Sequence, residues 1–153
     1  MPSRLLPSSL LSTAGRIALA VAGTLAATLP GAAQEPATGA IRLELNALQK
    51  SEKGCRIAFV VENAMGRDIA RAAYEIALFN KEGLVDRLLV LDFQELPNEK
   101  TKVRRFDLAD ADCDAIGRVL INDASACEGD GLEPGDCIAR LEATSRSTVT
   151  FGK

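Results

Sequence analysis

Residues 55–62 have the sequence Cys-Arg-Ile-Ala-Phe-Val-Val-Glu, in which every second side chain is apolar. The apolar side chains from Cys55 to Val61 fall on one face of an extended chain, because side chains alternate between the two faces of a β-strand. The β-branched and aromatic residues also favour a strand. The segment therefore predicts a half-buried strand, with Phe59 and Val61 in the core.

Alternating apolar residues recur along the rest of the chain, separated by turns that contain Gly, Asn or Pro. Tyr74, Ile76 and Leu78 are expected to join the core. Residues 68–73 favour a helix locally but are too few for a helix that stands alone. About seven short strands predict an immunoglobulin-like antiparallel β-sandwich. The expected strands, besides 55–62, cover 41–46, 74–78, 84–93 (a strand or a strand with a bulge), 101–108 and 119–121.

The segment 137–146 fits two structures. It could form a helix capped by Asp136, or a strand that shows Ala139, Leu141 and Ala143 on one face. We choose the strand, because the neighbouring elements are strands.

The N-terminal residues resemble an export signal. Arg4 and Arg16 are the charged residues of the first 34, and an apolar run covers 17–29 before the small residues 31–33. This pattern predicts a secretory signal peptide over 1–33, a flexible lead-in over 34–40 and one domain over 41–153. The alternative is an uncleaved anchor, but a membrane-spanning helix needs about 20 apolar residues.

Four cysteines lie after the predicted signal peptide, and none forms a Cys-x-x-Cys pair. Structural zinc and thioredoxin-like redox sites use such close pairs, whereas exported domains use cysteines for disulfides. Three pairings are possible. The Gly- and Pro-rich loop 128–136 favours a bridge across its neck. The favoured pairs are Cys127–Cys137 and Cys55–Cys113.

The composition excludes several classes of site. The chain has no histidine, which removes Ser-His-Asp and Cys-His nucleophiles and His-ligated metals. The net charge is −3. The densest basic cluster of the chain lacks the interleaved aromatic residues that bind nucleic acid. We therefore interpret this cluster as an edge strand protected by charge. The cluster consists of Lys100, Lys102, Arg104 and Arg105.

Acidic residues around Cys113 resemble part of a calcium loop. Asp110, Asp112 and Asp114 occupy the spacing of the first three ligands of an EF-hand, but Ala115 and Ile121 replace the required Gly and Glu. We keep as an alternative a calcium- or cation-stabilised module that uses the acidic segments 107–114 and 128–136. The other interpretation is an exposed acidic turn, and we expect no metal site.

The middle of the chain resembles the FxLYD-type immunoglobulin-like domains of bacteria. Leu78 matches the naming motif, while Ile76, Phe79 and Asn80 replace its first Phe, its Tyr and its Asp. The whole chain is also similar to small exported proteins of alphaproteobacteria. The resemblance implies an extracytoplasmic β-sandwich and brings no catalytic residue. It rests on Val60-Val61-Glu62-Asn63, Tyr74 to Asn80, Glu82-Gly83, and Leu96-Pro97 to Phe106.

These observations predict a non-catalytic periplasmic binding or accessory module without a cofactor. The expected partner is another envelope protein, recognised through a loop end or an exposed strand edge. We expect no nucleic-acid binding, and no membrane span after the signal peptide is removed.

Overall fold

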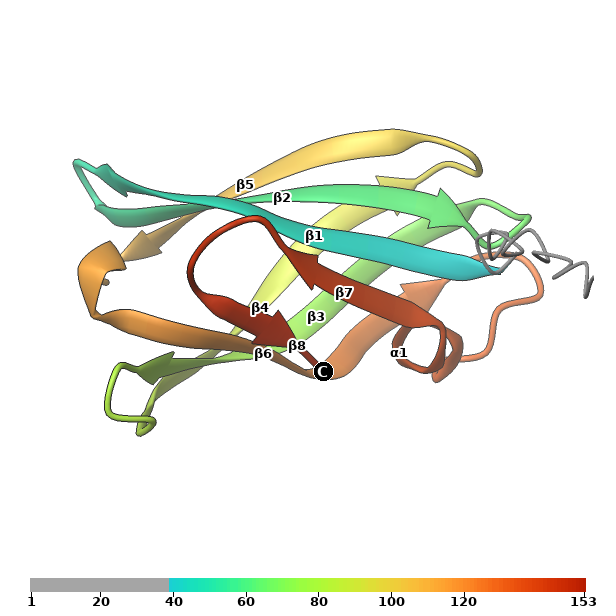
Figure 1. Cartoon of the computed structure of the whole chain (residues 1–153). Coiled ribbons are helices and arrows are strands. Elements are labelled where there is room, and N and C mark those ends of the chain that lie inside the picture. Colours follow the sequence, from blue (N-terminus) through green and yellow to red (C-terminus); the bar gives the residue numbers. More distant parts are fainter. Residues whose placement is uncertain (1–38) are drawn as a thin grey trace, which may run out of the picture. The chain divides into compact units, whose positions relative to one another are not determined.

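The alternating segments form two facing sheets of four strands in the computed structural model, which describes residues 39–153 (Figure 1). Sheet A has the strand order β5-β2-β1-β7 and sheet B the order β4-β3-β6-β8. The predicted β-sandwich is therefore confirmed. The strands are β1 (Ala40–Ser51), β2 (Gly54–Ala64), β3 (Ile69–Asn80), β4 (Val85–Leu96), β5 (Thr101–Ala109), β6 (Ile116–Glu128), β7 (Leu141–Ser145) and β8 (Thr150–Gly152), with short helices η1 (Cys113–Ala115) and α1 (Asp136–Ala139).

The strand order is that of an immunoglobulin-like sandwich, in which β5-β2-β1 faces β4-β3-β6. Two strand pairs differ from the expected antiparallel arrangement. β7 pairs parallel to β1, and β8 pairs parallel to β6. The reason is that the chain leaves β6 at the end of sheet B, crosses through α1 to sheet A, and enters β7 in the direction of β1 (Figure 1).

Three segments differ from their predicted structure. Residues 69–73 belong to β3, because β3 lies between β4 and β6 and tertiary pairing overrides a weak local helix propensity. The predicted strand 119–121 is the middle of the longer strand β6. The strand expected over 137–146 is wrong in its first half, which forms α1 and leaves Ala139 exposed. Its second half is β7, with Leu141 buried.

The N-terminal boundary is described only in part. The predicted signal peptide 1–33 and residues 34–38 of the predicted lead-in lie outside the described residues. The last two residues of that lead-in are described: Gly39 donates a backbone hydrogen bond to the carbonyl of Ala64 at 2.8 Å, and Ala40 begins β1.

Aromatic rings from both sheets meet in the centre of the sandwich. Phe59 of β2 lies 5.5 Å from Phe93 of β4, 6.2 Å from Phe106 of β5 and 5.6 Å from Phe151 of β8, measured between ring centroids. Tyr74 of β3 contacts Phe93 at 5.6 Å. Five of the six aromatic residues of the chain thus form one cluster. All five predicted core residues, Phe59, Val61, Tyr74, Ile76 and Leu78, are at most 1 % exposed.

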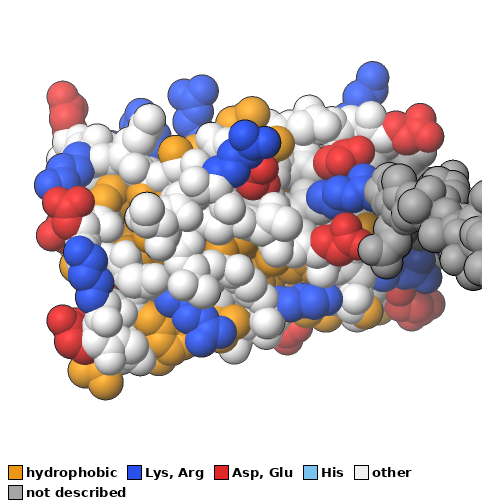
Figure 2. Space-filling view, viewed as in Figure 1, with side chains coloured by type: hydrophobic (Ala, Val, Ile, Leu, Met, Phe, Trp, Pro, Cys, Tyr) orange, Lys and Arg blue, Asp and Glu red, His pale blue; other side chains and the backbone are white. Residues whose placement is uncertain are grey.

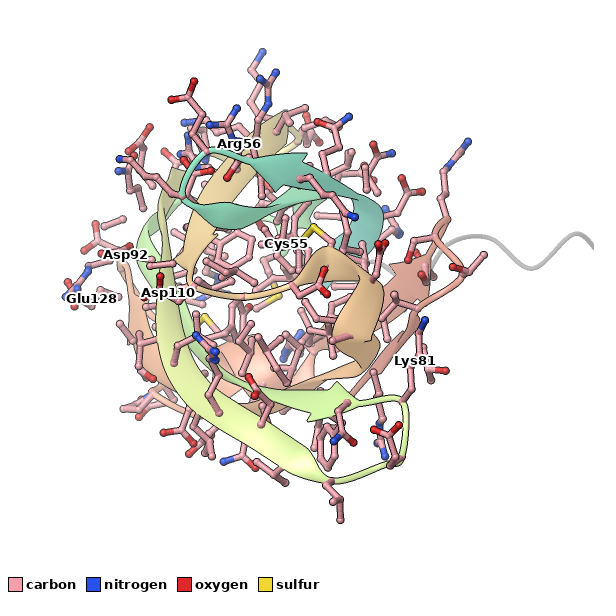
Figure 3. The ribbon with its side chains drawn as sticks, turned by 90° about the vertical axis from the view of Figure 1, so that its left-hand side faces the viewer. Cys55, Arg56, Lys81, Asp92, Asp110 and Glu128 are labelled. Carbon is pink, nitrogen blue, oxygen red and sulfur yellow. A yellow bond between two sulfur atoms is a disulfide. The ribbon has the colours of Figure 1, made fainter. Side chains whose placement is uncertain are left out.

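The favoured cysteine pairing is confirmed. Cys55 at the start of β2 is bonded to Cys113 of η1, and Cys127 near the end of β6 is bonded to Cys137 of α1. Looking along the sandwich, Figure 3 shows the Cys55 bridge among the side chains that fill the space between the sheets. The Tyr74 hydroxyl donates a hydrogen bond to the carbonyl of Cys137 at 3.2 Å, and burial raises the pKa of this phenol. Disulfides persist in oxidising compartments, so the two bridges indicate a non-cytoplasmic protein.

Asn63 is the one buried polar residue among the described residues. Its side chain makes hydrogen bonds to the backbone of the β2–β3 connection and to the end of β4. Its amide nitrogen donates to the carbonyls of Arg67 at 2.9 Å and Leu96 at 2.6 Å. Its amide oxygen accepts from the backbone nitrogen of Met65 at 2.9 Å. Because a buried amide is stable only when its hydrogen bonds are made, Asn63 fixes the β2–β3 connection against the end of β4.

We expect Phe59→Ala to lower the free energy of unfolding by about 3–5 kcal/mol, because it leaves a cavity at the centre of the aromatic cluster. Urea denaturation measures the loss. Phe79→Ala is the matched control, since Phe79 is outside the cluster and partly exposed, and should cost much less. Equal losses for the two variants would contradict the assignment of strand faces.

Removing Cys55–Cys113 should lower the melting temperature more than removing Cys127–Cys137. The bridges join residues 58 and 10 positions apart, for which the chain-entropy model gives about 4 and about 3 kcal/mol. Thermal melts of the two double Cys→Ser variants test this order. A larger drop for the Cys127→Ser, Cys137→Ser variant would show that the short bridge matters more.

Candidate interaction surface

The outer face of sheet A follows the usual pattern of an antiparallel sheet, polar toward solvent and apolar toward the core. Charged side chains on neighbouring strands pair across this face. The ion pairs are Arg42–Glu62 at 3.1 Å, Arg56–Asp107 at 2.9 Å and Arg146–Glu44 at 2.9 Å. Val103 of β5, 58 % exposed, is the one strongly exposed large apolar residue of this sheet among the described residues.

The outer face of sheet B has apolar side chains at its middle. On β4, Val85, Leu88 and Val90 are 55 %, 54 % and 55 % exposed. Val85 and Leu88 have the apolar neighbours Phe79 and Ala77 on β3, and Leu120 follows Ala77 on β6. Val90, at the border of this surface, lies beside Glu75. We call this surface the apolar face. It consists of Phe79, Val85, Leu88, Val90 and Leu120, with Ala77, which is only 4 % exposed, between them.

The apolar face lies beside the turn between β3 and β4. In Figure 2 hydrophobic atoms are exposed at the lower left, where Figure 1 places this turn. Leu84, at the end of the turn, is 66 % exposed. The exposed apolar surface thus extends from the middle of β4 to the turn.

The sequence of β4 explains this surface. Leu88 to Leu91 are four apolar residues in succession, so the strand has no polar face at its middle. Leu91 and Phe93 point into the core, whereas Leu88 and Val90 point away from it. Strands that are apolar on both faces are typical of sheets covered on both sides. The apolar pattern of 84–93 predicts a strand; the four successive apolar residues are the signal that indicates its second apolar face.

The charges at the two ends of the apolar face differ, although Arg71 pairs with Asp92 at 3.0 Å at the acidic end. Arg118 lies near the β3–β4 turn, with its guanidinium carbon 5.3 Å from the centroid of the Phe79 ring. Toward the other end of the sheet lie Glu75, Asp92 and Asp123. A hydrogen bond from the backbone of Gln94 lowers the pKa of Asp92, so this carboxylate stays charged at neutral pH.

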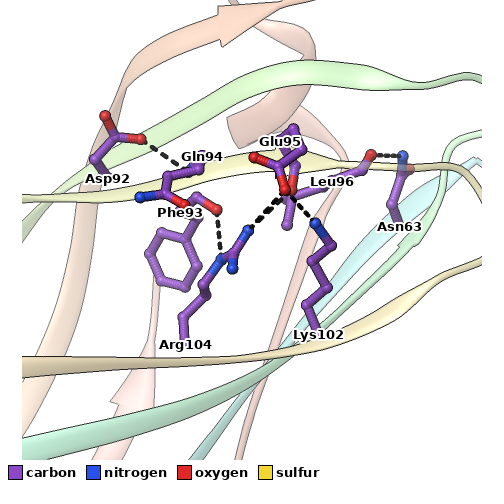
Figure 4. A network of polar contacts seen from close by, with 8 residues as sticks. All are labelled: Asn63, Asp92, Phe93, Gln94, Glu95, Leu96, Lys102 and Arg104. Carbon is purple, nitrogen blue, oxygen red and sulfur yellow. Dashed lines mark hydrogen bonds and ion pairs between the residues drawn. The ribbon is translucent and has the colours of Figure 1, made fainter.

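The free edge of β4 is partly closed by side chains of β5 (Figure 4). Arg104 donates to the carbonyl of Phe93 at 2.7 Å through Nε and to that of Glu95 at 3.1 Å through Nη2. Lys102 contacts the Glu95 carboxylate at 2.5 Å, and this hydrogen bond lowers the pKa of Glu95. Backbone carbonyls that would attract another strand are therefore already occupied.

The basic cluster is confirmed as part of an edge strand, since β5 is the outermost strand of sheet A. Lys102 and Arg104 share one face of this strand, as expected from the alternation. Their side chains turn toward β4 and join the two sheets at that seam.

The acidic residues near Cys113 are used in local contacts. Arg56 donates a hydrogen bond to Asp107 and lowers the pKa of this carboxyl group. Lys50 does the same for Asp114, at an N–O distance of 2.6 Å. Asp112 accepts from the backbone nitrogen of Asp114 at 3.0 Å and so caps η1.

The two acidic segments of the calcium alternative lie at opposite ends of the sandwich (Figure 1). Segment 107–114 precedes β6 and segment 128–136 follows it, so about 40 Å of extended strand separates them. Within residues 39–153 no group of three or more acidic or cysteine side chains is placed to hold a metal ion. The two segments therefore do not build one shared cation site.

Comparisons with known proteins give no relative for this chain: no protein-family model, no curated protein and no solved structure matches it. Of the helices in residues 39–153, none has the length and apolar character needed to span a bilayer.

Replacing Arg104 by Met should destabilise the fold by about 1–3 kcal/mol, because two carbonyls of β4 lose a charged donor. Arg105→Met is the control, since Arg105 is exposed and lies on the opposite face of β5. Urea denaturation of both variants gives the comparison. If Arg104→Met unfolds at the same urea concentration as Arg105→Met, the seam contributes nothing to stability.

Proposed function

We propose that the protein is a non-catalytic binding module of the periplasm, and that it associates with another protein through the apolar face. The observation that carries the proposal is the difference between the two sheets. Sheet A presents ion-paired charges to solvent, whereas sheet B presents Val85, Leu88 and Val90. Exposed contiguous apolar surface is costly in water and marks interaction sites.

The aromatic residues support this assignment. Phe79 is the one aromatic residue outside the central cluster, and it lies on the apolar face beneath Arg118. Phe and Arg are both enriched at protein interfaces, where an aromatic ring fills a pocket and a guanidinium pairs at its border. We therefore expect Phe79 and Arg118 to make the main contacts with the partner protein.

The compartment follows from the cysteines together with the N-terminal sequence. The disulfides require an oxidising environment, and the apolar run 17–29 with its small-residue exit resembles a signal peptide. The resemblance to FxLYD-type extracytoplasmic domains supports the same compartment. A chain without histidine that offers ion-paired carboxylates supports a binding role over a catalytic one.

The cation-stabilised alternative has less support. Its residues Asp107 and Asp114 already hold Arg56 and Lys50, and its two segments lie at opposite ends of β6. No observation on these segments favours a ligand over solvent, and we do not propose one.

Photo-cross-linking in the cell envelope tests the binding surface. Benzoylphenylalanine is placed at position 90 on β4 and, as a control, at position 103 on β5, where the exposure is similar at 58 % against 55 %. We expect a discrete protein adduct from position 90 and none from position 103. Absence of an adduct at 90, or the same adducts at both positions, would contradict the proposed surface.

A further inference from the structure

The apolar face has a central row of apolar side chains, and its β4 residues are arranged symmetrically about this row. Leu88, Ala77 and Leu120 are direct neighbours on β4, β3 and β6 and form this row. On β4, Val85 lies on one side of the row and Val90 on the other. A two-fold axis along the row would place Val85 against Val90 of a second molecule and Leu88 against its own copy. On β4 and along the central row apolar side chains would then meet apolar side chains, while Phe79 on β3 would lie opposite Glu75 of the second molecule.

The charges obey the same symmetry. Arg118 lies on β6 beside Phe79, on one side of the central row. Asp123 lies on β6 beside Glu75, on the other side of the row. The two-fold axis would therefore bring Arg118 of one molecule over Asp123 of the other, twice per pair. Opposite charges placed this way fix the register of an interface and speed association.

The whole outer face of sheet B, of which the apolar face is the middle part, is large enough for a weak specific contact. Three long strands about 4.8 Å apart, over about ten residues at about 3.4 Å each, offer roughly 500 Å² of flat area per molecule. Two such faces give about 1,000 Å², the lower limit for a specific protein interface. Ala77 at the centre is a small residue, so the larger side chains around it can interdigitate with those of a second sheet.

We propose that the occupant of the apolar face is a second copy of this chain, packed face to face across a two-fold axis along the Leu88–Ala77–Leu120 row. This inference rests on the proposed function and names its partner. The contact forms a reversible dimer in which the outer faces of two copies of sheet B are covered. It also explains why the middle of β4 is apolar on both faces, as a strand between two cores would be.

The edge of β4 is a less suitable site for a second copy. Pairing strand to strand would leave Leu88 and Val90 exposed, since they point away from the sheet and not along it. It would also need the carbonyls of Phe93 and Glu95, which Arg104 occupies. The face-to-face arrangement leaves these hydrogen bonds intact.

Sedimentation equilibrium of the purified, disulfide-bonded protein tests the dimer over a range of concentrations up to millimolar. We expect a monomer–dimer equilibrium that Leu88→Lys weakens at least tenfold, because two lysines would face each other at the axis. Val103→Lys is the control on sheet A and should leave the equilibrium unchanged. A single monomeric species at all concentrations, or a dimer that is insensitive to Leu88→Lys, would overturn the inference.

A charge exchange tests the two-fold geometry. Arg118→Asp and Asp123→Arg should each weaken the dimer, and the double variant should restore it, because the pairs across the axis are then reversed. Failure of the double variant to recover overturns this arrangement.

The cross-linking experiment separates the dimer from the proposed function. If the protein is monomeric and position 90 gives an adduct with a different protein, the dimer is wrong but the apolar face remains a binding surface. Absence of both dimer and adduct defeats both.

Discussion

The contact between Phe59 and the rings of Phe93, Phe106 and Phe151 holds the two sheets together, and the rest of the structure depends on it. The chain has few large side chains, with no tryptophan and one tyrosine. Aromatic residues bury the most surface per residue, so they form the centre of a core that is otherwise built from aliphatic side chains. The strands that carry these rings come from both layers and are fixed in register by the contact.

The periphery of the sandwich is fastened by other means. Cys55–Cys113 and Cys127–Cys137 tie η1 and α1, at opposite ends, to the strands beside them. Arg104 closes the seam between β5 and β4 with hydrogen bonds to backbone carbonyls. A domain of this size has a modest margin of stability. Covalent and charged contacts at its borders thus complement a core that is concentrated in the middle.

The apolar face differs from these features because its side chains point to solvent and not into the core. Leu88 and Val90 expose more than half of their surface, while the outer face of sheet A carries charges in ion pairs. An apolar surface that is costly to expose points to an interaction. The proposed dimer would cover it and would use Arg118 and Asp123, which have opposite signs on opposite sides of the central row.

The sequence by itself determined the strand character of most of the chain and the inward faces of β1, β2 and β3, because alternation and turn residues act over short distances. Of three possible cysteine pairings it favoured the one that the structure has. The core positions of Phe59 and Tyr74 followed from that alternation. Only the tertiary structure decided that residues 69–73 join β3, that Cys137 lies in a helix, and that β7 and β8 run parallel to their neighbours. It also decided that the outer face of β4 is exposed, since the local sequence of Leu88 to Leu91 does not state which strand lies at an edge or what covers its second face. These features depend on contacts between segments far apart in the chain, which local patterns do not encode.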